Sequence, residues 1–242
     1  MKKIILNIIL TASIVIFCFS GWKLFGYYKS YQQADHEYEQ IRENVLDKGR
    51  KNIDFIKLKE MNPDVIGWIY IPGTRIDYPV VKGKDNEEYL HKTFDGTENN
   101  SGSIFMDKDG KKDFLAAHNI FYGHHMRNGS MFADLLKFRK QSFVKKHNEI
   151  ILFTPKKMIL LKVIAAYARK ADAKIPVSFG DDSQRISYLK DIQKRSEIQT
   201  DLVQEEKTAK IYTFVTCSYE SEDNRTFVHA VKDREYILHE VK

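Results

Sequence analysis

The chain has 242 residues, of which 43% are hydrophobic and 30% are charged, which suits one ordinary globular domain with an appendage. Its net charge is +6, but four lysines before residue 30 supply +4 of it, with no acidic residue before Asp35. The remaining chain is only mildly basic, which gives no support to nucleic-acid binding and suits an anionic wall or membrane surface.

An almost wholly apolar run covers residues 4–22. As a helix it is about 28 Å long, close to the hydrocarbon thickness of a bilayer. It exceeds the apolar core of a secretory signal peptide, and no small-x-small cleavage site follows it. Aromatic residues beyond it fit an interfacial belt: Trp22, Phe25, Tyr27 and Tyr28. We expect an uncleaved single-pass anchor over residues 4–25, with a cytoplasmic tip over residues 1–3 and the domain outside the cell.

Residues 26–62 are expected to form helices that cover one side of the domain. Apolar residues recur there at helical spacing, Gly49 is expected to end the first helix, and a second short helix covers residues 55–61. From residue 63 to residue 242, short β-branched and aromatic runs alternate with turn residues. This pattern predicts a mainly β domain, either a small barrel or a sandwich, with added helices.

The expected elements of that domain follow in chain order. Strands are predicted over residues 65–71, 76–81, 102–107, 119–124, 149–154, 158–168, 211–217 and 225–231, and residues 236–241 close the chain. Helical segments are predicted over residues 85–90, 130–138 (capped by Ser130) and 181–196. The two strands that flank residues 218–224 predict a hairpin, with Cys217 ending one strand and Arg225 beginning the next.

The cysteines, Cys18 and Cys217, cannot pair, because Cys18 lies inside the expected anchor. A single exported thiol is unusual, since oxidising compartments favour bridged pairs. Cys217 is either a buried inert residue or a reactive nucleophile. A nucleophile needs a partner, because a free thiol is only about 3% ionised at neutral pH.

Histidine is the usual partner, and His124 and His125 stand out because they end an apolar strand directly after Gly123. The other histidines are expected in the stalk (His36), in polar connections (His91, His118, His147) or in strands (His229, His239). A zinc site built from His118, His124 and His125 is an alternative, but zinc-ligand spacings are missing, so no metal or cofactor is expected. Arg225 is either a solvated charge or a donor to a developing oxyanion.

These residues resemble the signatures of sortases: Tyr122-Gly123-His124-His125-Met126, Thr213-Phe214-Val215-Thr216-Cys217 and Arg225. Residues 62–69, 71–80 and 102–107 are similar to class B sortases in particular, and the resemblance runs from about residue 55 to the C-terminus. It implies an eight-stranded sortase β-barrel with N-terminal helices and a long helix before the cysteine strand, preceded by one transmembrane helix.

The resemblance also implies an activity. Such an enzyme is a membrane transpeptidase of Gram-positive cell surfaces, which cuts an N-P-x-T sorting signal of a surface protein after Thr and joins it to a peptidoglycan amine. By position, Cys217 would form the thioacyl enzyme, His124 would transfer protons, and Arg225 would hold the substrate and stabilise the oxyanion. Residues expected to line the substrate groove are Asn86, Leu90, Val215 and Thr216.

Three departures from the family pattern bear on specificity. Phe214 replaces the usual Leu and points away from Cys217 by alternation, so it should affect packing. Val215 replaces a serine found in several class B enzymes and shares the face of Cys217. The loop from Cys217 to Arg225 is also short.

Two rival functions were considered. A papain-like hydrolase requires its histidine well after the cysteine, and only His229 and His239 follow Cys217. The other rival is an inactive anchored wall-binding module in which Cys217 is structural, and the reactivity of that thiol separates the two.

Overall fold

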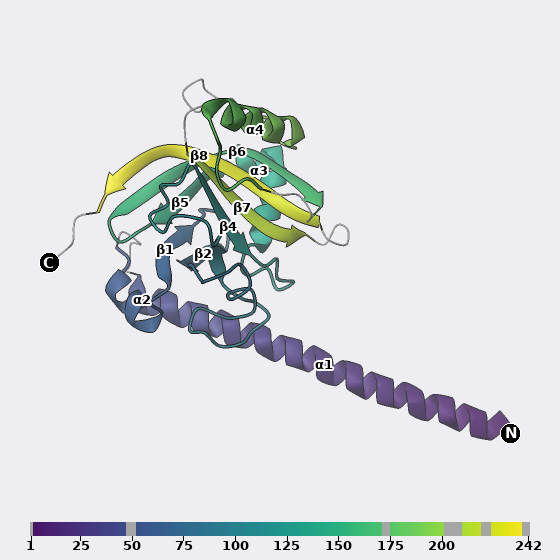
Figure 1. Ribbon diagram of the computed structural model, residues 1–242. Coiled ribbons are helices and arrows are strands. Elements are labelled where there is room, and N and C mark those ends of the chain that lie inside the picture. Colours follow the sequence, from purple (N-terminus) through teal and green to yellow (C-terminus); the bar gives the residue numbers. More distant parts are fainter. Residues whose placement is uncertain (1, 47–51, 171–174, 201–209, 219–223, 239–242) are drawn as a thin grey trace.

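The computed structural model describes residues 2–46, 52–170, 175–200, 210–218 and 224–238, with the side chains of residues 217 and 218 left out. Eight strands form a closed barrel in the order β1-β2-β3-β4-β7-β8-β6-β5 (Figure 1). The β2–β3 and β4–β7 pairs are parallel and the others are antiparallel. The predicted eight-stranded barrel is therefore confirmed, and the alternative sandwich is excluded.

The strands match the expected segments closely. They are β1 (Val65–Tyr70), β2 (Asp77–Val81), β3 (Ile104–Met106), β4 (His118–Gly123), β5 (Glu149–Phe153), β6 (Lys157–Lys170), β7 (Ile211–Ser218) and β8 (Asn224–Ile237). Alternation sends one face of each strand into the barrel. Phe214 of β7 lies on the inner face, fully buried, and stacks on Phe121 of β4 with ring centroids 5.1 Å apart. The phenylalanine therefore fills the barrel, as predicted.

Helices cover the barrel from outside. They are α1 (Lys2–Val45), α2 (Phe55–Met61), the 3-10 helix η1 (Ala133–Arg139), α3 (Gln141–Val144) and α4 (Asp182–Arg195). Helix α4 lies over the outer face of the strands near β6 and β8 (Figure 1), where Leu189 and Ile192 are buried. It is the long helix expected before the cysteine strand.

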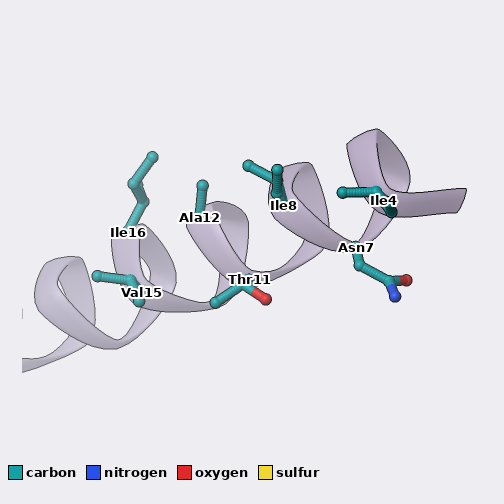
Figure 2. Close-up of a pocket in the computed structure, with 7 residues that line it drawn as sticks. All are labelled: Ile4, Asn7, Ile8, Thr11, Ala12, Val15 and Ile16. Carbon is teal, nitrogen blue, oxygen red and sulfur yellow. The ribbon is translucent and has the colours of Figure 1, made fainter. Parts of the chain in front are cut away.

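Helix α1 is one continuous element, although the sequence suggested a separate anchor and stalk helix. Its N-terminal part projects away from the barrel (Figure 1), and an 18-residue window there has a mean hydropathy of 2.4 with none of it buried. That length and composition are sufficient to cross a membrane. Figure 2 shows a shallow hollow along this part of the helix, with two polar side chains among its lining: Ile4, Asn7, Ile8, Thr11, Ala12, Val15 and Ile16.

Two local predictions were wrong, and one strand is longer than expected. The helix expected from Ser130 begins at Ala133, because Met131 has a left-handed backbone (φ 56°) that turns the chain; the Ser130 hydroxyl donates to Asn128 Oδ1 (2.7 Å). Residues 85–90 form turns, since the Asp85 carboxylate accepts the N–H groups of two residues just after it. Residues 236–237 continue β8, because its charged second half still pairs with β6; residues 239–241 lie outside the described residues.

Candidate active site

A cleft of about 300 Å³ opens on the outer side of the barrel where β4, β7 and β8 meet. It is lined by Asn86, Glu87, Leu90, Phe105, Tyr122, Gly123, His124, Val215, Thr216 and Arg225. Six residues that were predicted to form the site therefore gather in one hollow, although they come from four separate stretches of the chain.

Strand register places Cys217 at this cleft. In the antiparallel β7–β8 ladder, Cys217 is paired with Arg225. In the parallel β4–β7 ladder the last pair is Gly123 with Thr216, so His124 and Cys217 each follow directly after a paired residue. The backbone therefore brings the three predicted catalytic residues to one edge of the barrel.

His124 is partly buried and has a defined tautomer. Its Nε2 lies 2.7 Å from the carbonyl oxygen of Leu90, and because a carbonyl can only accept, Nε2 carries the proton. Nδ1 is then the nitrogen available for proton transfer. The ring also stacks on His91, with centroids 5.7 Å apart. Burial lowers the pKa of His124, and the Leu90 carbonyl opposes that change by stabilising the imidazolium form.

The structure also separates His124 from its neighbour. His125 is not part of the cleft lining and instead forms a backbone bridge with Met131. Of these two histidines, His124 is therefore the one that lines the cleft.

Two residues that the sequence reasoning did not assign to the site organise the floor of the cleft. Asp107 Oδ2 accepts a hydrogen bond from the Tyr122 hydroxyl (3.0 Å) and another from Asn86 Nδ2 (3.0 Å). Burial and the nearby carboxylate raise the pKa of Tyr122, so its phenol remains a donor. Tyr122 could have been found, because alternation along β4 places it on the same face as His124.

This carboxylate also defines what Asn86 does. The Asn86 side chain donates to Asp107 and accepts the backbone N–H of Lys108 (2.7 Å), so both ends of its amide are engaged with the end of β3. Asn86 therefore lines the cleft and at the same time fastens the segment that carries Leu90.

The remaining predicted lining residues come from β7. Val215 is 1% exposed and packs in the apolar cluster beneath α4. Thr216 borders the cleft, but alternation assigns its side chain to the inner face together with Phe214. Position 215 thus presents methyl groups, without a hydroxyl, to the cleft.

His118 was expected in a polar connection, and this was wrong. It is the first residue of β4, is 1% exposed and bonds to Pro176 and Thr213. His118 is not among the residues that line the cleft. Among the residues that the structure describes, no group of three or more His, Cys, Asp or Glu side chains could hold a metal ion.

Comparisons with known proteins agree with this geometry. A sortase domain model matches residues 69–233. Sortase B of Staphylococcus aureus is 32% identical over 219 residues, which is 88% of this chain and 88% of that protein. The structure of sortase B from Clostridium perfringens has a TM-score of 0.71 at 32% identity and covers 75% of this chain and 100% of that chain. Sortase B from Bacillus anthracis in complex with AAEK1 has a TM-score of 0.76 at 28% identity over 86% of this chain and 99% of that chain.

A closed eight-stranded barrel, a cleft at the end of β7 and these likenesses place the chain in the sortase family of cysteine transpeptidases. Sequence relatives and solved structures alike are sortases B, so within that family the chain is of class B.

Proposed function

We propose that this sortase cuts the C-terminal sorting signal of a surface protein, of N-P-x-T type, after its threonine and joins the new carboxyl group to a peptidoglycan amine. The observation that carries the proposal is the shared cleft. His124, Arg225 and four predicted groove residues line it, and Cys217 is paired with Arg225 in the adjoining ladder.

The residues have the following roles. In the thiolate–imidazolium form of the pair, the Cys217 thiolate attacks the threonine carbonyl, and His124 gives its Nδ1 proton to the departing amine, which leaves a thioacyl enzyme and a neutral His124. An incoming amine loses its proton to His124 and attacks the thioester, so that the thiolate is released. The Arg225 guanidinium donates to the oxygen that becomes negative in both steps. The proposed reaction steps use no cofactor.

Anchoring is proposed from α1. Its exposed apolar segment is long enough to cross a bilayer, and aromatic residues that follow it remain exposed, including Trp22 at 68% and Phe25 at 65%. With Lys2 and Lys3 in the cytoplasm, the barrel lies outside the cell beside the wall.

The test uses the full-length chain in detergent micelles with quenched N-P-x-T peptides and an amine acceptor. We expect cleavage after Thr, with Cys217→Ala and His124→Ala lowering kcat/KM about a thousandfold or more. His125→Ala is the matched control and should remain active.

Three outcomes of this test would each contradict a different part of the proposed function. Full activity of Cys217→Ala would refute the mechanism. If His125→Ala were inactive and His124→Ala active, the proposal would have assigned the proton transfer to the wrong histidine. A wild-type chain that neither cleaves peptides nor reacts with alkylating reagents at Cys217 would instead be the anchored wall-binding module.

A further inference from the structure

We infer that Tyr38 of α1 is a positioning residue for His124, because it holds both loops that meet at that imidazole. The inference rests on the proposed catalytic role of His124. Tyr38 lies in the C-terminal third of α1, where the helix runs along the barrel (Figure 1) and buries four side chains: Ala34, Tyr38, Ile41 and Val45.

The hydroxyl of Tyr38 reaches the first loop, which precedes β3. It donates to the carbonyl oxygen of Gly102 at 2.8 Å and lies 3.2 Å from Ser103 Oγ. Tyr38 is 3% exposed, so this bond is formed away from water. Burial raises the pKa of Tyr38, and its hydroxyl therefore stays a donor.

Gly102, which accepts the Tyr38 hydrogen bond, also lies against the Leu90 carbonyl that orients His124. Its backbone is left-handed (φ +57°), and a Cβ added there would lie 2.5 Å from the Leu90 carbonyl oxygen. Gly102 thus packs directly against the atom that accepts the proton of His124 Nε2. Only glycine suits both that conformation and that close approach.

The ring of Tyr38 is connected through Tyr78 of β2 to the second loop, which begins at His124 and leads to η1. It meets Tyr78 edge-on, with centroids 5.1 Å apart and planes at 86°. The Tyr78 hydroxyl accepts the N–H of Met131 (3.1 Å), and the N–H of Phe132 closes the loop on the carbonyl of His124 (2.9 Å).

A second contact from α1 supports the same loop. Asp35 Oδ2 accepts a hydrogen bond from Asn128 Nδ2 (3.1 Å). One face of α1 therefore fixes the acceptor of His124 Nε2 on one side and the backbone of His124 on the other. The helix proposed to hold the enzyme in the membrane also sets the geometry of its proton-transfer group.

Tyr38→Phe tests this, because it removes the hydroxyl bond and keeps the ring against Tyr78. In the full-length chain in micelles we expect kcat/KM to fall about fivefold. The ¹⁵N resonance of His124 Nε2 should also shift as its hydrogen bond to Leu90 loosens. The matched control is Tyr212→Phe, which removes another buried bond, from the Tyr212 hydroxyl to the Phe114 carbonyl (3.1 Å), away from the cleft.

The outcomes are distinguishable. If Tyr38→Phe keeps wild-type kcat/KM and an unshifted His124 resonance, the inference is overturned and the proposed function stands. Equal losses in Tyr38→Phe and Tyr212→Phe, without a His124 shift, would also overturn it, since they would reflect stability alone. If the wild type does not cleave, or His124→Ala is fully active, the proposed function itself fails.

Discussion

Arg225 occupies a position in which the shape of its side chain matters as much as its charge. It lines the cleft and is paired with Cys217 across the β7–β8 ladder. A planar guanidinium can donate two parallel hydrogen bonds, whereas an ammonium acts as a point charge.

Arg225→Lys should therefore lower kcat/KM about a hundredfold, by losing the oriented donors. Peptide cleavage by the full-length enzyme measures the effect. Arg234→Lys, on the exposed second half of β8, is the control and should match the wild type. A fully active Arg225→Lys would show that charge alone suffices.

Asp107 gives a second prediction at this scale. Its Oδ2 accepts from Tyr122 and Asn86, while its Oδ1 accepts the N–H of Asp109 (2.9 Å). In Asp107→Asn, one oxygen becomes an NH₂ group, so whichever way the amide turns, one set of donors loses its acceptor.

Asn86 loses its bond to residue 107 when the NH₂ group replaces Oδ2, and we therefore expect KM of Asp107→Asn to rise about fivefold, the cost of one lost hydrogen bond. Asp109→Asn alters an exposed carboxylate beside it and should leave KM unchanged. Unaltered peptide kinetics in Asp107→Asn would mean that the Asn86 contact is not needed for substrate binding.

At the scale of elements, buried side chains connect four adjacent strands beneath α4. Pro176 offers only a carbonyl, so His118 Nδ1 is its donor, and His118 Nε2 then accepts the Thr213 hydroxyl (2.7 Å). Thr213 Oγ1 in turn accepts His229 Nδ1–H (2.8 Å), and His229 Nε2 accepts the Tyr167 hydroxyl (3.1 Å). Each of these hydrogen bonds then has one donor and one acceptor, provided that both imidazoles are neutral.

That condition predicts a pH dependence of stability. Burial lowers the pKa of His118 from 6.5 to about 4, and lowers that of His229 as well. Between about pH 4 and pH 6.5, the unfolded protein binds more protons than the folded one. The free energy of unfolding therefore rises with pH in this range, and stability is lost as the pH falls below about 6.5. His118 alone should contribute a loss of about 2 kcal/mol between pH 7.5 and pH 5.

Urea unfolding of the full-length chain at the two pH values measures this loss. His118→Asn should flatten the dependence, and His36→Asn, on the exposed face of α1, should preserve it. An identical pH dependence in the wild type and His118→Asn would contradict the proposed neutral pair.

The sequence predicted much at this level because its signals are local. Alternation and turn residues located the strands, and the motifs around His124, Cys217 and Arg225 pointed to residues that meet at one edge of the barrel. What it missed depends on contacts between distant segments. The sequence around His118 predicted an exposed polar connection. Its burial is possible because Pro176 and Thr213, which are distant in sequence, provide hydrogen-bond partners for both ring nitrogens. Likewise, the bond between Asp107 and Asn86 joins residues 21 positions apart.

At the scale of the whole molecule, α1 makes the proposed topology testable. In a Cys18→Ala, Cys217→Ala background, Lys190→Cys, which lies on the exposed face of α4, should react with a membrane-impermeant maleimide on intact cells. Lys3→Cys should be protected until the membrane is permeabilised, since the proposed topology places residue 3 on the cytoplasmic side. Labelling of Lys3→Cys in intact cells, with Lys190→Cys protected, would reverse the topology.

The continuity of α1 has one more consequence. Ser30, whose hydroxyl donates to Asn99 of the barrel (3.1 Å), follows the apolar segment by only eight residues, a helical distance of about 12 Å. If α1 anchors the protein as proposed, its unbroken helix lets the barrel drift sideways and spin about that axis but leaves it little freedom to rise or tip. Its encounters with a client protein and with an amine are then confined to a thin layer, where a two-dimensional search replaces diffusion through volume. Turnover in cells should accordingly follow the surface density of both partners in that layer, rather than their overall amounts.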